Sequence, residues 1–149
     1  MEIGLEYIFQ AYIKLEKGID VGLTANGFRN IVPIIGGNFK GNDLNGEVIP
    51  GGADWQLIRQ DGIIQAEAKY TLKTDDGALI FVVNKGVINP ELGYARASPH
   101  FEVSNEKYMW LCKSLFISEI TPMLDEKTPI SDDPSPSPNG VSIRFYRVT

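Results

Sequence analysis

The stretch GGNFKGNDLNGEVIPGGADWQLIRQDG, residues 36–62, decides the fold predicted for this chain. It holds seven glycines and one proline, and it alternates small with apolar residues. Such a pattern is typical of a strongly coiled barrel wall, where bulges and close strand contacts favour glycine. A phosphate-binding loop is the functional alternative, but no Gly-Lys-Ser/Thr follows and no helix receives the loop. We therefore interpret the stretch as structural.

Strand signals extend from this stretch in both directions. Residues 6–15, EYIFQAYIKL, and residues 141–148, VSIRFYRV, both alternate in side-chain character. Tight hairpin turns are marked by Asn-Gly or Asp-Gly pairs at 26–27, 45–46, 61–62 and 76–77. Turns at this spacing, with no amphipathic helix between them, indicate an antiparallel meander. Because both terminal strands are too apolar for exposed edges, we predict that they pair and close an all-β barrel of roughly nine to eleven strands.

Two further segments interrupt the strand pattern. NEKYMWLCK, residues 105–113, is the one plausible helical turn, and Ser104 or Asn105 is placed to cap it. Residues at about 123–140 are acidic and rich in proline, which cannot donate to a strand ladder. We predict a long surface loop there, within a single domain that spans residues 1–149.

Composition limits the classes of function. The 149 residues suffice for one domain with its own core, and 43% hydrophobic and 22% charged residues are ordinary values. A net charge of −5, with scattered Lys and Arg, argues against nucleic-acid or anionic-membrane partners. The single cysteine, Cys112, excludes an internal disulfide and suits a reducing compartment. Because no signal peptide and no apolar run of ~20 residues is present, we expect a cytoplasmic protein.

Several motifs are similar to those of uncharacterised protein family (UPF) 0311, also called domain of unknown function 3237. They are PGGADWQ (50–56), RQDG (59–62), AKYTLKTDDGALIFV (68–82), SPHFEV (98–103) and IRFYRV (143–148). The resemblance covers nearly the whole chain and implies a small lipocalin-like antiparallel β-barrel. It implies no activity, since the family has no established function to transfer. His100 and Lys69 depart from the family pattern, which usually has arginine at both positions.

The triplet Asp54-Trp55-Gln56 is the first candidate site. In a strand, Asp54 and Gln56 share one face and Trp55 lies on the other. An acid in a barrel strand is costly unless it is paired or faces water. One interpretation is that Asp54 caps the preceding Gly-Gly turn through backbone N–H groups. The other places Asp54 and Trp55 in one concavity at a barrel end, together with Glu67, Tyr70 or His100.

Two more polar positions have alternative interpretations. Glu67 alternates with alanines, so its face is either solvent or a polar lumen that holds a small ligand. His100, the only histidine, would share a strand face with Glu102 and either acts as a general base or forms an ordinary surface or core pair. A single His and a single Cys leave only carboxylates for a metal. We therefore predict neither a metal site nor a cofactor.

The sequence is compatible with three functions. The first is binding of a small, partly apolar metabolite, with candidate contacts from Asp54, Trp55, Glu67, Tyr70, Asn84, His100 and Trp110. The second is a cofactor-independent isomerase, cyclase or hydrolase that uses Asp54 or His100 as a general base. The third is a structural or oligomeric protein with a filled barrel, and a homodimer is one such form.

Overall fold

The computed structural model describes residues 1–123 and 139–149, and in these it contains nine strands and two 3-10 helices. The elements are β1 (Leu5–Leu15), β2 (Ile19–Thr24), β3 (Gly27–Gly41), β4 (Gly46–Ile58), β5 (Ile64–Thr74), β6 (Leu79–Asn89), η1 (Pro90–Leu92), β7 (Tyr94–Val103), η2 (Glu106–Cys112), β8 (Phe116–Met123) and β9 (Gly140–Val148).

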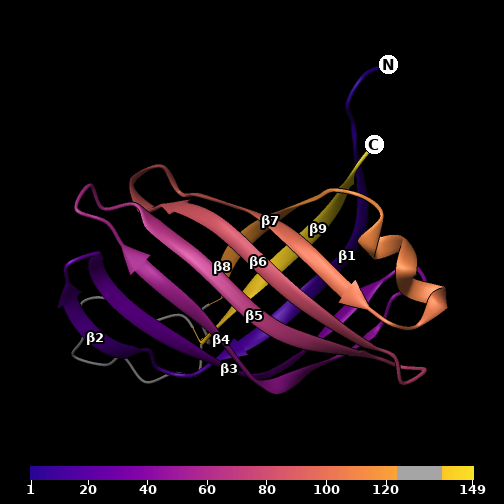
Figure 1. Cartoon of the computed structure of the whole chain (residues 1–149), viewed down its shortest axis with the longest axis horizontal. Helices are drawn as coiled ribbons and strands as arrows, with labels where there is room; N and C mark the ends of the chain where they lie inside the picture. The colour runs from indigo at the N-terminus through magenta and orange to yellow at the C-terminus, as the bar shows by residue number, and fades with distance from the viewer. Residues whose placement is uncertain (124–138) are drawn as a thin grey trace.

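Eight of these strands form a closed antiparallel barrel (Figure 1). The order runs β1-β9-β8-β7-β6-β5-β4-β3, and β3 pairs with β1 to complete the ring. The predicted pairing of the first and last strands is confirmed, since Phe9 of β1 is in register with Phe145 of β9. The predicted number of barrel strands was too high. Within the described residues β2 pairs only with β3, so it extends the wall without entering the ring.

Two glycines of residues 36–62 shape the barrel: Gly37 allows β3 to pair with β1, and Gly51 forms a bulge in β4. Gly37 has φ +132°, and a Cβ there would lie 2.0 Å from the Tyr12 carbonyl oxygen of β1. Only glycine therefore lets β3 lie this close to β1. Gly51 has φ +116° where the β4–β5 register shifts between Ile49 and Ala53. This bulge sets the face on which the following residues of β4 lie.

The end of the barrel next to η2 is packed with aromatic side chains. Phe9 stacks on Phe145 with ring centroids 4.2 Å apart, and both side chains are fully buried. Tyr108 and Leu111 of η2 are also buried in this cluster. The predicted helical turn and cap are confirmed in 3-10 form, because the Asn105 side chain accepts a hydrogen bond from the Lys107 backbone N–H.

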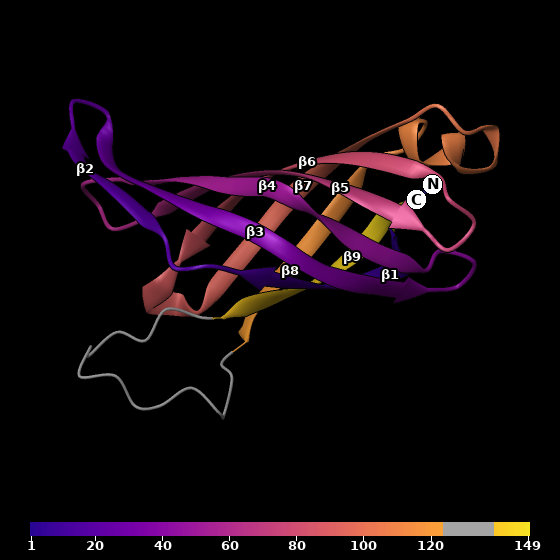
Figure 2. The same ribbon diagram turned by 90° about the horizontal axis from the view of Figure 1, so that it is seen from below.

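A clasp fixes η2 to the β5–β6 turn. The Asp76 carboxylate accepts a hydrogen bond from the Tyr108 hydroxyl at 2.8 Å and pairs with Lys107 at 3.0 Å. Hydrogen bonds from Thr74, Lys107 and Tyr108 lower the pKa of Asp76 far below its ordinary value. The β5–β6 turn and η2 lie at the opposite end of the molecule from the β2–β3 hairpin (Figure 2).

Some predictions fall outside what the structure tests. The proline-rich loop predicted at about 123–140 has residues 124–138 outside the described part of the chain. The single-domain organisation and the finer likeness to lipocalins stay predictions. None of the helices in residues 1–123 and 139–149 has the length and apolar character needed to cross a membrane.

Candidate functional site

A cavity of about 320 Å³ lies inside the barrel, toward the end away from η2. Its wall is mainly aliphatic, with Ile13, Val32, Ile64, Ile88, Ile120 and Ile143 among the lining residues. The space exists because alanines occupy inward positions of β5 and β7, namely Ala66, Ala68 and Ala95. Cavities of this size, with apolar walls and a few polar groups, are typical small-molecule sites.

Asp54 brings a carboxylate into this apolar cavity. The bulge at Gly51 places it in register with Val32 of β3 on one side and Ala68 of β5 on the other. Its Oδ1 accepts a hydrogen bond from the Glu67 backbone N–H at 2.9 Å, and its Oδ2 accepts one from Gln56 Nε2 at 2.8 Å. Neither donor belongs to the Gly-Gly turn, so the predicted turn cap is wrong. A carboxylate has capacity for about four hydrogen bonds, and two remain for a ligand.

The environment of Asp54 favours its protonated form. Burial raises the pKa of Asp54 above its ordinary value of 3.8, and the negative charge of Glu67 adds to this rise. The hydrogen bonds from Gln56 and from the Glu67 backbone N–H act in the opposite direction but do not cancel the effect of burial. A carboxyl group shifted in this direction is better suited to exchange protons near neutral pH.

Three amide side chains accompany Asp54. Asn30 of β3 donates from Nδ2 to Gln56 Oε1 at 3.5 Å, the long limit of a hydrogen bond, and both residues line the cavity. Asn30 Oδ1 is buried without a hydrogen-bond partner in the described structure. Asn84 of β6 is only 2% exposed, and its Oδ1 accepts a hydrogen bond from the Ser118 hydroxyl at 3.2 Å.

The charge of the cavity is one-sided. Among the described residues that line it, Asp54 and Glu16 are the ionisable ones, and no Lys, Arg or His contributes. An anionic ligand would therefore lose its hydration without gaining a counter-charge. Within residues 1–123 and 139–149 no group of three or more His, Cys, Asp or Glu side chains could hold a metal ion.

The predicted neighbours Asp54 and Trp55 lie on opposite faces of the barrel wall. Trp55 is 38% exposed on the outside, with Lys69 Nζ 5.9 Å from its ring centroid. The predicted shared concavity is therefore wrong, because alternation along β4 points adjacent side chains to opposite sides. Glu67 is also outside, 3.7 Å from Lys69 and 3.8 Å from Lys85. Its solvent-face interpretation is confirmed, and the lumen alternative is wrong.

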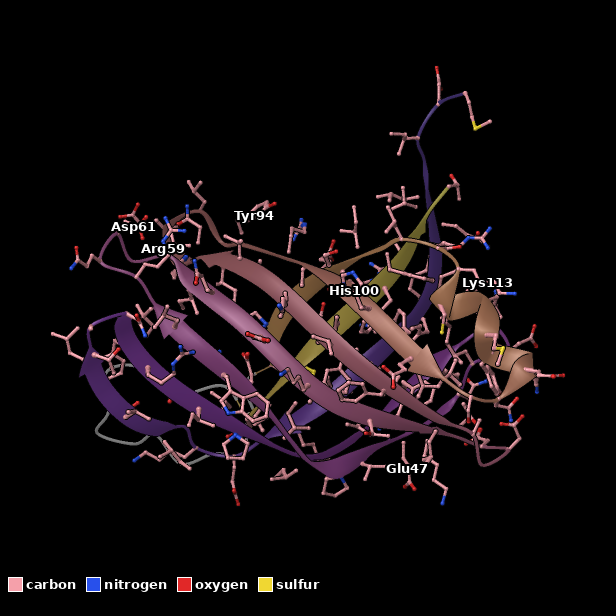
Figure 3. All side chains as sticks on the ribbon, viewed as in Figure 1. Glu47, Arg59, Asp61, Tyr94, His100 and Lys113 are labelled. Carbon is pink, nitrogen blue, oxygen red and sulfur yellow. The ribbon has the colours of Figure 1, made fainter. Side chains whose placement is uncertain are left out.

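The remaining candidates lie away from the cavity or behind it. His100 is exposed on the outer face of β7 (Figure 3), so it cannot serve as a base in the lumen. Trp110 of η2 packs at the other end of the barrel, with its ring centroid 6.3 Å from that of Phe116. Tyr70 is buried inside the barrel, and its hydroxyl has no partner among the described residues. Burial and the charge of Asp54 raise the pKa of Tyr70 strongly.

Three polar residues at or near the cavity were not predicted, namely Asn30, Glu16 and Ser118, and Gln56 was named beside Asp54 but not as a contact residue. Gln56 carried a usable signal, since it shares a strand face with Asp54 at a spacing of two residues. Asn30 would have followed from the β3–β4 register, which pairs it with Gln56. Glu16 and Ser118 had no signal in the sequence, because their place depends on how distant strands meet.

These features define a class of protein: a small closed β-barrel with a mixed apolar and polar lumen site. Residues 3–148 match the family described as "Protein of unknown function (DUF3237)", and the chain belongs to this family. The predicted membership of UPF 0311 is thereby confirmed. A UPF0311 protein of Rhodopseudomonas palustris (strain TIE-1) is 37% identical over 128 residues, which cover 75% of this chain and 84% of the relative.

Two further proteins extend the comparison. The crystal structure of a protein of unknown function from Rhodopseudomonas palustris has a TM-score of 0.85 at 31% identity, covering 100% of this chain and 99% of that one. The hydroalkoxylation enzyme phnH of Penicillium herquei is 31% identical over 107 residues, which cover 72% of this chain and 67% of the relative.

Proposed function

We propose that the lumen cavity binds a small, partly apolar metabolite. The observation that carries this proposal is the cavity of about 320 Å³, with aliphatic walls and polar side chains that converge from β3, β4 and β6. A barrel with a purely structural role would be expected to fill its interior at the usual close packing of protein cores. The exposed free thiol of Cys112 supports a cytoplasmic site of action, where thiols stay reduced.

Blocking the cavity tests this function. Ala68→Leu adds three carbon atoms to the floor between Asp54 and Asn84, whereas Gln65→Leu places the same leucine side chain on the exposed outer face of that strand. Isotope-labelled protein titrated with uncharged aromatic and aliphatic compounds should show saturable NMR shifts at inward residues of β4, β5 and β6. These shifts should vanish in Ala68→Leu and persist in Gln65→Leu. Shifts confined to the outer face, or unchanged in Ala68→Leu, would contradict a lumen site.

A second candidate function is cofactor-independent proton transfer by Asp54. It is supported by the raised pKa of a carboxyl group that lines the cavity and by a relative that is a hydroalkoxylation enzyme. Addition of an O–H group across a C=C bond breaks the O–H bond and the π bond of the alkene, and it forms one C–O bond and one C–H bond. It needs no oxidant or reductant. Asp54 would accept the hydroxyl proton and deliver a proton to the carbon.

Deuterium labelling tests this activity. Unsaturated alcohols incubated with the wild type in D₂O should give the addition product with deuterium on carbon, measured by mass spectrometry. Asp54→Asn should lower the rate on the order of 10²–10⁴-fold, as expected when a general acid–base group is lost. Glu102→Gln removes a carboxylate on the exposed outer face of β7 and should leave the rate unchanged. Equal rates in wild type and Asp54→Asn would exclude Asp54 as the proton carrier.

A further inference from the structure

Asn84 lies two strands from Asp54 along the wall of the cavity, and one small residue separates them. Ala68 is in register with Asp54 of β4 on one side and with Asn84 of β6 on the other. Neighbouring strands are about 4.8 Å apart, so the two polar residues lie about 10 Å apart at the backbone. The methyl group of Ala68 leaves the space between their side chains open, and all three residues line the cavity.

The orientation of the Asn84 amide is set by Ser118. The Ser118 hydroxyl, which is fully buried on β8, donates to Asn84 Oδ1 at 3.2 Å. The amide oxygen is thereby used, and Nδ2 is the group left for the cavity. Within the described residues Asn84 Nδ2 has no hydrogen-bond partner, although the residue is 2% exposed. Nδ2 is not one of the fully enclosed unpaired atoms of the described residues, so it reaches the cavity space. A donor there without an acceptor favours a ligand that brings one.

We propose that Asn84 binds a carbonyl oxygen, and that the ligand of the cavity is an uncharged carbonyl compound with an apolar body. This inference rests on the proposed function of the lumen and names its class of ligand. The amide Nδ2 donates and a carbonyl oxygen accepts, so the pair satisfies both groups. A carboxylate also offers acceptors, but the described lining provides Asp54 and Glu16 and no cation to balance it. Charge therefore selects the neutral carbonyl over the acid.

A matched set of probes tests the assignment. Benzylacetone carries a ketone, butylbenzene is its hydrocarbon analogue, and hydrocinnamate carries a carboxylate on a similar body. Isothermal titration of the wild type should give tighter binding of benzylacetone than of butylbenzene by about five- to tenfold, the value of one hydrogen bond in a dry site. Hydrocinnamate should bind more weakly than either.

The variant Asn84→Leu keeps a similar volume and removes the amide. It should bind butylbenzene as the wild type does and lose the preference for benzylacetone. If Asn84→Leu fails to fold because the Ser118 hydroxyl is left unpaired, the double variant Asn84→Leu/Ser118→Ala removes both polar groups and serves the same test. Gln65→Leu on the outer face is the control and should keep the preference.

Each outcome decides between the two proposals. A ketone preference that survives the loss of Asn84 would overturn the carbonyl assignment, as would equal binding of ketone and hydrocarbon by the wild type. Hydrocinnamate binding as tight as that of benzylacetone would overturn the charge argument. In these cases butylbenzene still occupies the lumen, and the proposed function stands. Absence of binding by all three probes would overturn the lumen site and the carbonyl assignment together.

Discussion

Replacing Ala95 with leucine measures whether the lumen is open space or packed core. Ala95 is 8% exposed and lines the cavity from β7. In the sheet, β5 and β6 separate β7 from β4, which carries Asp54. Leucine adds three carbon atoms, and burying them contributes about 2.4 kcal/mol at about 0.8 kcal/mol per carbon. Ordering the new side chain costs about 0.5–1 kcal/mol. The free energy of unfolding should therefore rise by about 1.5 kcal/mol.

Urea denaturation of ligand-free protein, followed by circular dichroism, gives this quantity. Ser98→Leu places the same side chain on the exposed outer face of β7 and should change stability by less than about 0.5 kcal/mol. In a filled core the added atoms would overpack and destabilise the barrel by about 1–3 kcal/mol. A destabilised Ala95→Leu beside an unaffected Ser98→Leu would refute the open lumen.

Four further predictions concern separate parts of the structure. Gly37→Ala should lower the free energy of unfolding, measured by urea denaturation, by about 1–3 kcal/mol more than Gly51→Ala does. Both glycines have positive φ, but only at Gly37 would a Cβ press against β1. Equal losses in the two variants would argue against glycine-dependent closure. Because the pKa of Asp54 is raised in the folded state, the wild type loses stability as pH rises above 3.8. In thermal melts the melting temperature of Asp54→Asn should therefore rise relative to that of the wild type between acid and neutral pH. Asp76 has a lowered pKa, so its stabilising effect is present above pH 3.8 and is lost as pH falls below it. The difference in melting temperature between the wild type and Asp76→Asn should therefore shrink in acid. A difference that stays constant with pH would contradict the clasp. Trp55→Ala should change the affinity of a lumen ligand, measured by titration, by no more than about twofold, because Trp55 lies on the outer face. A large loss of affinity would indicate a ligand site on the outer face.

The fold was predictable because its determinants are local. Asn-Gly and Asp-Gly turns and the alternation in β1 and β9 are visible in the sequence, and each acts within a few residues. The position of β2 was not predictable in this way. Its alternating residues resemble those of a barrel strand, and only the pairing of β3 with β1 shows that the ring closes without it.

The candidate site was predicted in part, for a related reason. Asp54 and Asn84 line the cavity, and both are polar residues among the mainly apolar residues of their strands. Trp55 and His100 were selected for their chemistry. Whether each side chain points into the barrel or outward depends on the bulge at Gly51 and on the register of β7, and the sequence shows neither. Ser118 orients Asn84 from two strands away in the wall, at a separation of 34 residues in the chain. A contact at that separation is fixed by topology and leaves no local trace.

Native mass spectrometry of protein purified without denaturation tests the central claim most directly. If the lumen is a metabolite site, the wild type should carry a noncovalent adduct that dissociates on collisional activation as an uncharged organic compound. The Ala68→Leu variant, purified in the same way, should appear at the mass of the bare chain. A bare wild-type chain, or an adduct that Ala68→Leu retains at the same occupancy, would contradict the account.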